Sequence, residues 1–161
     1  DIRKAEKATL MRDLSEAQIT QITDTNPTGS DTPINFIKTN GDLQLIYFTS
    51  NINNSGHNKL FAYAPTYGWL DQASDTYVGA SDNPIPMVVD PNGRVFFRSS
   101  VSGTASKLFM YEYWTGFQSR LSDTTQSAAV DDVPSELFYM NGSLFFSSKT
   151  GGFTKFFGLS L

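Results

Sequence analysis

The apolar residues of this chain gather in short runs that are separated by turns rich in Gly, Asn, Asp and Ser. Each run is too short for a globular helix and has the aromatic and β-branched content of a strand. The clearest runs follow Asn-Gly pairs at 40–41, 92–93 and 141–142 and read LQLIYFTS, RVFFRSS and SLFFSS. Asn-Gly favours tight hairpins because both residues tolerate positive φ. The pattern therefore predicts β-hairpins over most of the chain.

The runs belong to a repeat of about 50 residues. The triplet Lys-Leu-Phe at 59–61 recurs at 107–109 and, as Lys-Phe-Phe, at 155–157, both times with an offset of 48. A unit of this length with four strands has the size of a β-propeller blade. Two further motifs recur in the same order, a Ser/Thr-Asp-Thr triplet at 23–25, 74–76 and 122–124 and an Asp-x-Pro triplet at 31–33, 82–84 and 132–134.

Each complete copy is expected to contain four strands, of which the fourth is the most polar, as suits an outer edge. We predict first strands at 36–37, 87–89 and 137–140, second strands at 45–48, 95–97 and 144–146, third strands at 60–63, 108–111 and 156–159, and fourth strands at 68–73 and 116–121.

The third copy ends before a fourth strand. A candidate lies at the other end of the chain, because residues 17–23 precede Asp24 as residues 68–74 precede Asp75. Such closure would act within one chain or between chains. Three blades make an awkward ring, so we favour a symmetric dimer with a six-bladed ring or a piece of a longer propeller.

Residues 2–18 have a different pattern, rich in the helix formers Ala, Leu, Met, Glu, Lys and Arg. Leu10, Met11 and Leu14 share one face at helical spacing. We therefore expect an all-β protein with one N-terminal helix, made of repeated four-stranded antiparallel blades. The expected divisions are a helix at 1–16 and a β domain at 17–161, with copies at about 17–76, 77–124 and 125–161.

The motifs of the first copy are similar to those of a known repeat. The residues concerned are QITDTNPTGSDTP (21–33), the Asn-Gly pair, LIYFTSN (45–51) and KLFAYAP (59–65). Together they resemble the repeat of TolB-like β-propellers, in three copies over about residues 18–161. The chain has Asn-Gly where that family favours Asp-Gly. The resemblance implies a binding scaffold that is often exported, and it implies no particular reaction.

The N-terminal segment supports an alternative. KATLMRDLSEAQ (7–18), leading into a β-rich region, resembles the second half of the long N-terminal helix of type IV pilins and minor pseudopilins. This resemblance implies a structural subunit of a type IV pilus or type II secretion pseudopilus. Its long helix would pack on an antiparallel sheet, and a hydrophobic anchor would precede the sequence.

Composition narrows the function classes. Charged residues make up 17% of the chain and the net charge is −4, which argues against a nucleic-acid partner because phosphate binding depends on Lys and Arg. The chain has no cysteine, which excludes disulfides and thiolate metal sites. No apolar run approaches the ~20 residues of a membrane helix. We expect an exported protein (periplasm, cell surface or extracellular) that contacts membranes only through an upstream anchor.

Enzymatic motifs are not found, and we expect neither a catalytic residue nor a cofactor. The single histidine, His57, lies in a polar hairpin loop and is expected to face solvent. The recurring aspartates are expected to cap backbone N–H groups at turns. Asp82, Asp131 and Asp132 are also candidates for Ca²⁺, which takes six to eight oxygen ligands.

Aromatic residues near the turns between third and fourth strands are the ligand candidates. Tyr67 and Trp69 flank a glycine in one copy, and Tyr113 and Trp114 precede a glycine in the next. Such rings stack on sugar faces or anchor a protein partner, or else Trp69 and Phe117 cover the gap between blades. Loops at 51–58 and 99–107 are expected as inter-blade partner surfaces, with self-assembly as a further role. The repeated lysines Lys59, Lys107 and Lys155 are expected to be solvated charges at strand edges.

Overall fold

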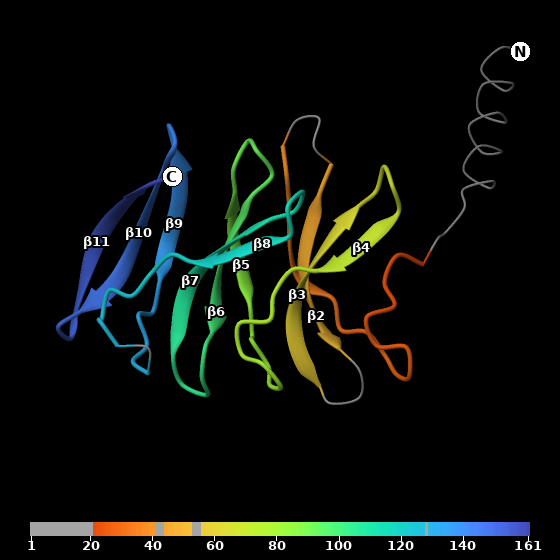
Figure 1. The fold of residues 1–161 in the computed structure, drawn as a ribbon, viewed down its shortest axis with the longest axis horizontal. Helices are drawn as coiled ribbons and strands as arrows, with labels where there is room; N and C mark the ends of the chain where they lie inside the picture. Colours follow the sequence, from red (N-terminus) through yellow and green to blue (C-terminus); the bar gives the residue numbers. More distant parts are fainter. Residues whose placement is uncertain (1–20, 41–43, 53–55, 128) are drawn as a thin grey trace, which may run out of the picture.

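The computed structural model describes residues 21–40, 44–52, 56–127 and 129–161, and within these ranges all regular structure is β (Figure 1). The strands form three antiparallel sheets. Sheet A contains β1 (Ile34–Lys38), β2 (Ile46–Ile52), β3 (His57–Ala64) and β4 (Trp69–Gln72). Sheet B contains β5 (Ile85–Val89), β6 (Val95–Ser100), β7 (Ser106–Glu112) and β8 (Phe117–Arg120). Sheet C contains β9 (Ser135–Met140), β10 (Ser143–Thr150) and β11 (Phe153–Ser160).

The three sheets repeat one up-and-down pattern, in which each strand pairs with the next along the chain. The predicted strands are confirmed, including the lack of a fourth strand in sheet C among the described residues. Their registers correspond as well: Leu60 lies opposite Thr49, Leu108 opposite Arg98, and Phe156 opposite Ser147. The three Lys-Leu/Phe-Phe triplets therefore occupy the same place in the third strand of each sheet.

The Asn-Gly pairs make the predicted turns where the structure describes them. Between β9 and β10, Asn141 and Gly142 form a two-residue turn with φ values of 49° and 79°. Positive φ at both positions matches the twist of the paired strands. Between β5 and β6, Gly93 has φ of 83°, and the Asp90 carboxylate accepts a hydrogen bond from the Arg94 backbone N–H at 2.9 Å.

The sheets stand side by side in a row, with sheets A and C at opposite ends (Figure 1). The first strands make contacts along the row, β1 with β5 and β5 with β9. Between sheets A and B lies a core in which Tyr47 is fully buried, and its hydroxyl donates to the Gly93 carbonyl at 2.6 Å. Burial raises the pKa of Tyr47 far above its usual value, so the phenol stays a neutral donor. The other members of this core are Leu45, Leu60, Ala62, Ala64, Ala73, Val95, Phe97, Phe109, Tyr111 and Tyr113.

The two end sheets each keep one face that none of the other described sheets covers. On sheet C this face carries Phe138, Phe145 and Phe156, whose rings stack with centroid separations of 5.2 to 6.2 Å. Phe156 is 64% exposed, whereas Leu60 and Leu108 at the same repeat position are fully buried. On sheet A the corresponding open face carries Phe36, also exposed, stacked on Phe48 at 5.4 Å. The ends of the row are therefore apolar.

The described strands form three sheets, not the single sheet of the pilin-like alternative. The helix expected at 1–16, with its apolar Leu10, Met11 and Leu14, lies outside the described residues. Loops 51–58 and 99–107 are not inter-blade loops: each joins the second and third strands of one sheet. No helix in the described ranges is long and apolar enough to cross a bilayer.

Candidate functional site

The repeated lysines of the first two sheets are buried, which corrects the expectation of solvated charges. Lys59 is 2% exposed and Lys107 is fully buried, whereas Lys155 in sheet C is exposed as expected. A buried ammonium group needs counter-charges and hydrogen-bond acceptors, since its desolvation is otherwise unfavourable. Those acceptors come from the connections that lead to the next sheet.

The Lys107 cluster shows how each charge is satisfied. The ammonium nitrogen lies 2.8 Å from Asp132 Oδ1 and 2.9 Å from Asp123 Oδ1. It also donates to the Ser127 carbonyl at 2.8 Å and to Thr125 Oγ1 at 3.1 Å. Burial by itself raises the pKa of Asp132, but hydrogen bonds from Lys107, Thr125 and Ser122 outweigh it and hold that pKa below its usual value.

The Lys59 cluster repeats this arrangement one sheet earlier. Lys59 Nζ lies 2.7 Å from both Asp75 Oδ1 and Asp82 Oδ1, and it donates to the Tyr77 carbonyl at 3.1 Å. Burial by itself lowers the pKa of Lys59, but the two carboxylates outweigh it and raise that pKa above its usual value. Each cluster thus fastens the third strand of one sheet to the connection that enters the next.

A hydroxyl pair accompanies each connection. The Thr76 and Ser99 hydroxyls are 2.7 Å apart, and the Thr124 and Ser148 hydroxyls are also 2.7 Å apart. The threonine hydroxyls additionally donate to backbone carbonyls of the second strand of the following sheet, both at 2.6 Å. The Ser-Asp-Thr and Asp-x-Pro motifs are therefore the repeated joint between successive sheets.

The calcium candidates are occupied by partners within the chain. Asp82 accepts from the backbone N–H groups of Thr76 and Tyr77 at 3.0 and 2.8 Å, as well as from Lys59. Asp132 lies in the Lys107 cluster, and Asp131 accepts from the Val133 N–H at 2.7 Å. These contacts are the capping role that the sequence indicated. Within the described ranges, no group of three or more acidic, His or Cys side chains is placed to hold a metal ion.

The four predicted ligand residues come together, although they belong to two sheets. Tyr67 and Trp69, from the β3–β4 turn, stack with centroids 4.9 Å apart. Tyr67 also meets Trp114, from the β7–β8 turn, edge to face at 6.3 Å, and Trp114 meets Tyr113 at 4.9 Å. The exposed fractions of Tyr67, Trp69 and Trp114 are 54%, 57% and 51%. We call these four residues the aromatic cluster.

Tyr113 is the buried member of the aromatic cluster and belongs to the core between sheets A and B. Its burial, together with the nearby negative charge of Asp71, raises the pKa of its hydroxyl above the usual value. Tyr113 therefore contacts Trp114 from the core side of the aromatic cluster. That Trp69 and Phe117 cover the gap between neighbouring sheets stays a prediction, and both side chains are more than half exposed.

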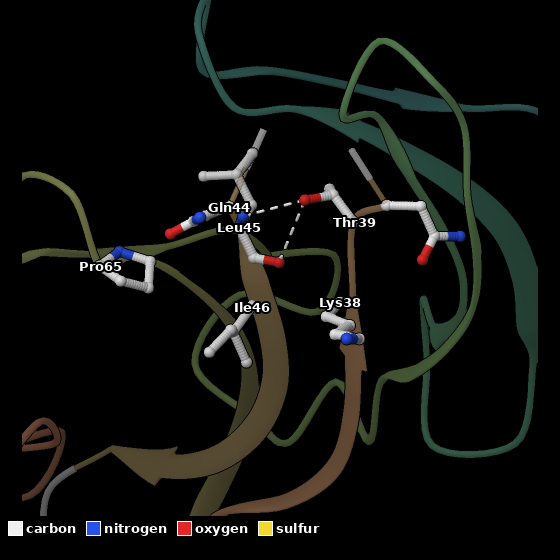
Figure 2. Close-up of a pocket in the computed structure, with 7 residues that line it drawn as sticks. Lys38, Thr39, Gln44, Leu45, Ile46 and Pro65 are labelled. Atoms are coloured by element: carbon white, nitrogen blue, oxygen red, sulfur yellow. Dashed lines mark hydrogen bonds between the residues drawn. The ribbon is translucent and has the colours of Figure 1, made fainter. Parts of the chain in front are cut away.

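A separate pocket of about 350 Å³ opens at the end of sheet A (Figure 2). There the Thr39 hydroxyl accepts a hydrogen bond from the Leu45 backbone N–H at 2.9 Å. This polar group of the pocket therefore stabilises the pairing of β1 with β2. Its described lining is Lys38, Thr39, Asn40, Gln44, Leu45, Ile46 and Pro65, with Lys38 as the charged member.

His57 is the first residue of β3 and is partly buried, so it is not the fully solvent-facing loop residue that the sequence predicted. Comparison with protein-family models, with curated proteins and with solved structures found no significant match.

Proposed function

We propose that this chain is a non-enzymatic binding and assembly module of an exported protein, with its sheets serving as consecutive blades of a TolB-like propeller. The blade interpretation is supported by the same strand order in each sheet and by contacts between successive first strands. The aromatic cluster is the observation that carries the binding role.

The aromatic cluster has the properties of a contact surface. Three of its rings are more than half exposed, although Trp and Tyr are usually covered in a monomer. Both turns are held on sheets joined by the Lys59 cluster, so little conformational freedom is lost when a ligand settles on the rings. Tyr and Trp also dominate binding energy at interfaces.

A glycan is the partner that this surface favours. The turn residues beside the rings, namely Thr66, Gly68, Thr115 and Gly116, are small or polar, so the exposed apolar area here consists of aromatic rings, with Phe117 next to them. A protein interface needs about 800 Å² on each side with an apolar centre. Flat, isolated ring faces instead match the apolar face of a sugar. A protein partner is the other outcome of the test.

The test uses the fact that both tryptophans of the chain belong to the aromatic cluster. Soluble fragments of chitin, cellulose and peptidoglycan are titrated while Trp emission is recorded, and retention on the insoluble polymers is measured in parallel. We expect a saturable emission change with at least one glycan, and at least a tenfold loss of affinity in Trp69→Ala and Trp114→Ala.

Phe117→Ala is the matched control, because Phe117 is 55% exposed, lies next to the same turn, and makes no ring contact with the cluster. It should bind as the original chain does. Equal retention by the original chain and both Trp variants would remove the aromatic cluster from the binding role. Retention of a protein partner that depends on both tryptophans would keep the cluster and replace the glycan.

A further inference from the structure

We propose that two copies of this chain associate head to tail, with sheet C of one copy packed on sheet A of the other and Lys155 seated against Asp31. The inference rests on the proposed function, because it takes the sheets as blades and names a second copy as the assembly partner. Two such contacts would close a dimer of six sheets.

The N-terminal end of the described chain holds the acidic half of a lysine cluster. Asp31 Oδ1 accepts from the Asn26 backbone N–H at 2.8 Å, as Asp82 Oδ1 accepts from the Tyr77 N–H at 2.8 Å. The Thr25 and Ser50 hydroxyls lie 2.9 Å apart and repeat the hydroxyl pair of the other connections. In the described structure, Asp31 has no ammonium partner.

The C-terminal end holds the basic half. Lys155 occupies the position of Lys59 and Lys107 in the third strand, and within the described residues it has no carboxylate partner. Its ammonium group instead lies 5.8 Å from the centre of the exposed Phe153 ring. Among the described residues, an acidic half-cluster therefore lies at the sheet A end of the row and a lysine without a carboxylate at the sheet C end.

The strand edge of sheet C is also open in the part of the chain that the structure describes, where β11 pairs with β10 alone. The segment that could pair with it is partly formed at the other end of the chain. Gln21 Nε2 donates to the Thr23 carbonyl at 2.7 Å, as Gln72 Nε2 donates to the Ser74 carbonyl at 2.7 Å at the end of β4. Residues 21–23 thus repeat the side-chain contact that residues 72–74 make at the end of β4.

The uncovered faces of sheets A and C match, position by position, the two faces that pack together between sheets A and B. Sheet B packs Val95, Phe97 and Tyr111 on sheet A. The equivalent positions on sheet A are Ile46, Phe48 and Tyr63. They line an apolar hollow of about 340 Å³ that no sheet covers.

The face that would fill this hollow is the open face of sheet C. Phe145 and Phe156 there correspond to Tyr47 and Leu60, which sheet A presents to sheet B. Gly158 lets Phe145 lie close to β11, because an added Cβ would stand 3.3 Å from that ring. Burial of these exposed Phe rings against the hollow would drive the association.

One copy cannot supply both halves of this contact, because they lie far apart in it. Sheet A and residues 21–31 are at one end of the row, and sheet C is at the other (Figure 1). One chain therefore cannot bring Lys155 to Asp31 without rearranging its sheets. A second copy satisfies both ends with contacts that already exist twice within the chain.

Light scattering after gel filtration tests the inference, with the full chain measured from about 1 µM to about 1 mM. We expect a dimer, and we expect Lys155→Glu to weaken it at least about 30-fold, as for a disrupted buried charge pair. Lys155 is exposed in the single chain, so the variant should fold. Arg120→Glu is the control, because it reverses an exposed charge in β8 of sheet B, which lies between the two end sheets.

Disulfide trapping tests the register in this cysteine-free chain. Phe61 pairs with Gln72 and Phe109 with Arg120, so Phe157 of one copy should pair with Gln21 of the other. A mixture of Gln21→Cys and Phe157→Cys chains should form the mixed disulfide dimer. A mixture of Gln21→Cys and Lys149→Cys chains should form at least tenfold less.

A chain that stays monomeric throughout, or a dimer that Lys155→Glu and Arg120→Glu affect equally, would overturn the inference. So would equal trapping in the two mixtures. These results would leave the Trp emission titration unchanged. Failure of assembly and failure of the aromatic cluster are therefore separate findings.

Discussion

Replacing Lys107 with methionine should destabilise the protein far more than its position in a strand suggests. Methionine fills the space of the lysine stem but has no ammonium group. The change removes contacts to Asp132 at 2.8 Å, Asp123 at 2.9 Å and the Ser127 carbonyl at 2.8 Å. Asp132 is fully buried, so its charge cannot turn to water when the ammonium is gone.

The magnitude follows from what Asp132 keeps. Removing one partner of a buried ion pair costs about 3–5 kcal/mol. Asp132 would still accept from the Ser122 hydroxyl at 2.8 Å, the Thr125 hydroxyl at 2.7 Å and the Thr124 N–H at 3.2 Å. We therefore expect the lower end, about 3 kcal/mol. With a urea dependence of about 2 kcal/mol per molar, the unfolding midpoint should fall by about 1.5 M.

Urea unfolding followed by both Trp emission and circular dichroism measures this loss, at one protein concentration and with coincident curves as the criterion for a single transition. Lys149→Met is the matched control, because Lys149 is an exposed lysine in a strand. It should change the free energy of unfolding by less than about 0.5 kcal/mol. If Lys107→Met costs no more than Lys149→Met, the buried cluster does not hold the sheets together.

Two further changes examine the same joints. The pKa of Asp132 is lowered on folding, because hydrogen bonds from Lys107 and the nearby hydroxyls outweigh burial, so its stabilising effect is present above about pH 4 and is lost as the pH falls through the lowered value. Asp132→Asn should therefore flatten the acid limb of a stability–pH curve, and an unchanged limb would contradict this assignment. Leu108→Ala should cost about 2–5 kcal/mol, whereas Phe156→Ala, at the same repeat position but exposed, should cost less than about 1 kcal/mol at concentrations where the chain is monomeric. Similar urea midpoints for the two variants would mean that sheet C is covered in the single chain.

The strands could be predicted because their signals are local. Asn141-Gly142 allows one kind of tight hairpin, and the apolar runs on either side have strand length. The 48-residue offset of the lysine triplets then placed equivalent strands in three sheets. The sequence also predicted that the aromatic residues lie next to turns. It could not predict that they contact one another, because Tyr67 and Trp114 belong to different sheets.

The lysines were misjudged because their partners are distant in sequence. Lys107 finds Asp123 and Asp132 only after β8 and a connection have been laid down, 16 and 25 residues later. A lysine in an apolar strand is usually an edge charge, so local pattern alone favours exposure. The signal that was available is the joint recurrence of the lysine with Ser-Asp-Thr and Asp-x-Pro in one order.

The amino-acid sequence by itself determined the strands, their turns and their threefold repetition, because backbone preference and hydrophobic pattern act within a few residues. Only the tertiary structure decided which charges are buried, which rings meet and which faces stay open. Those outcomes depend on the packing of one sheet against the next, which Lys59 and Lys155 show by having equivalent strand positions and opposite exposure. Whether a side chain is buried depends on which part of the chain packs against it, and the fold determines that packing.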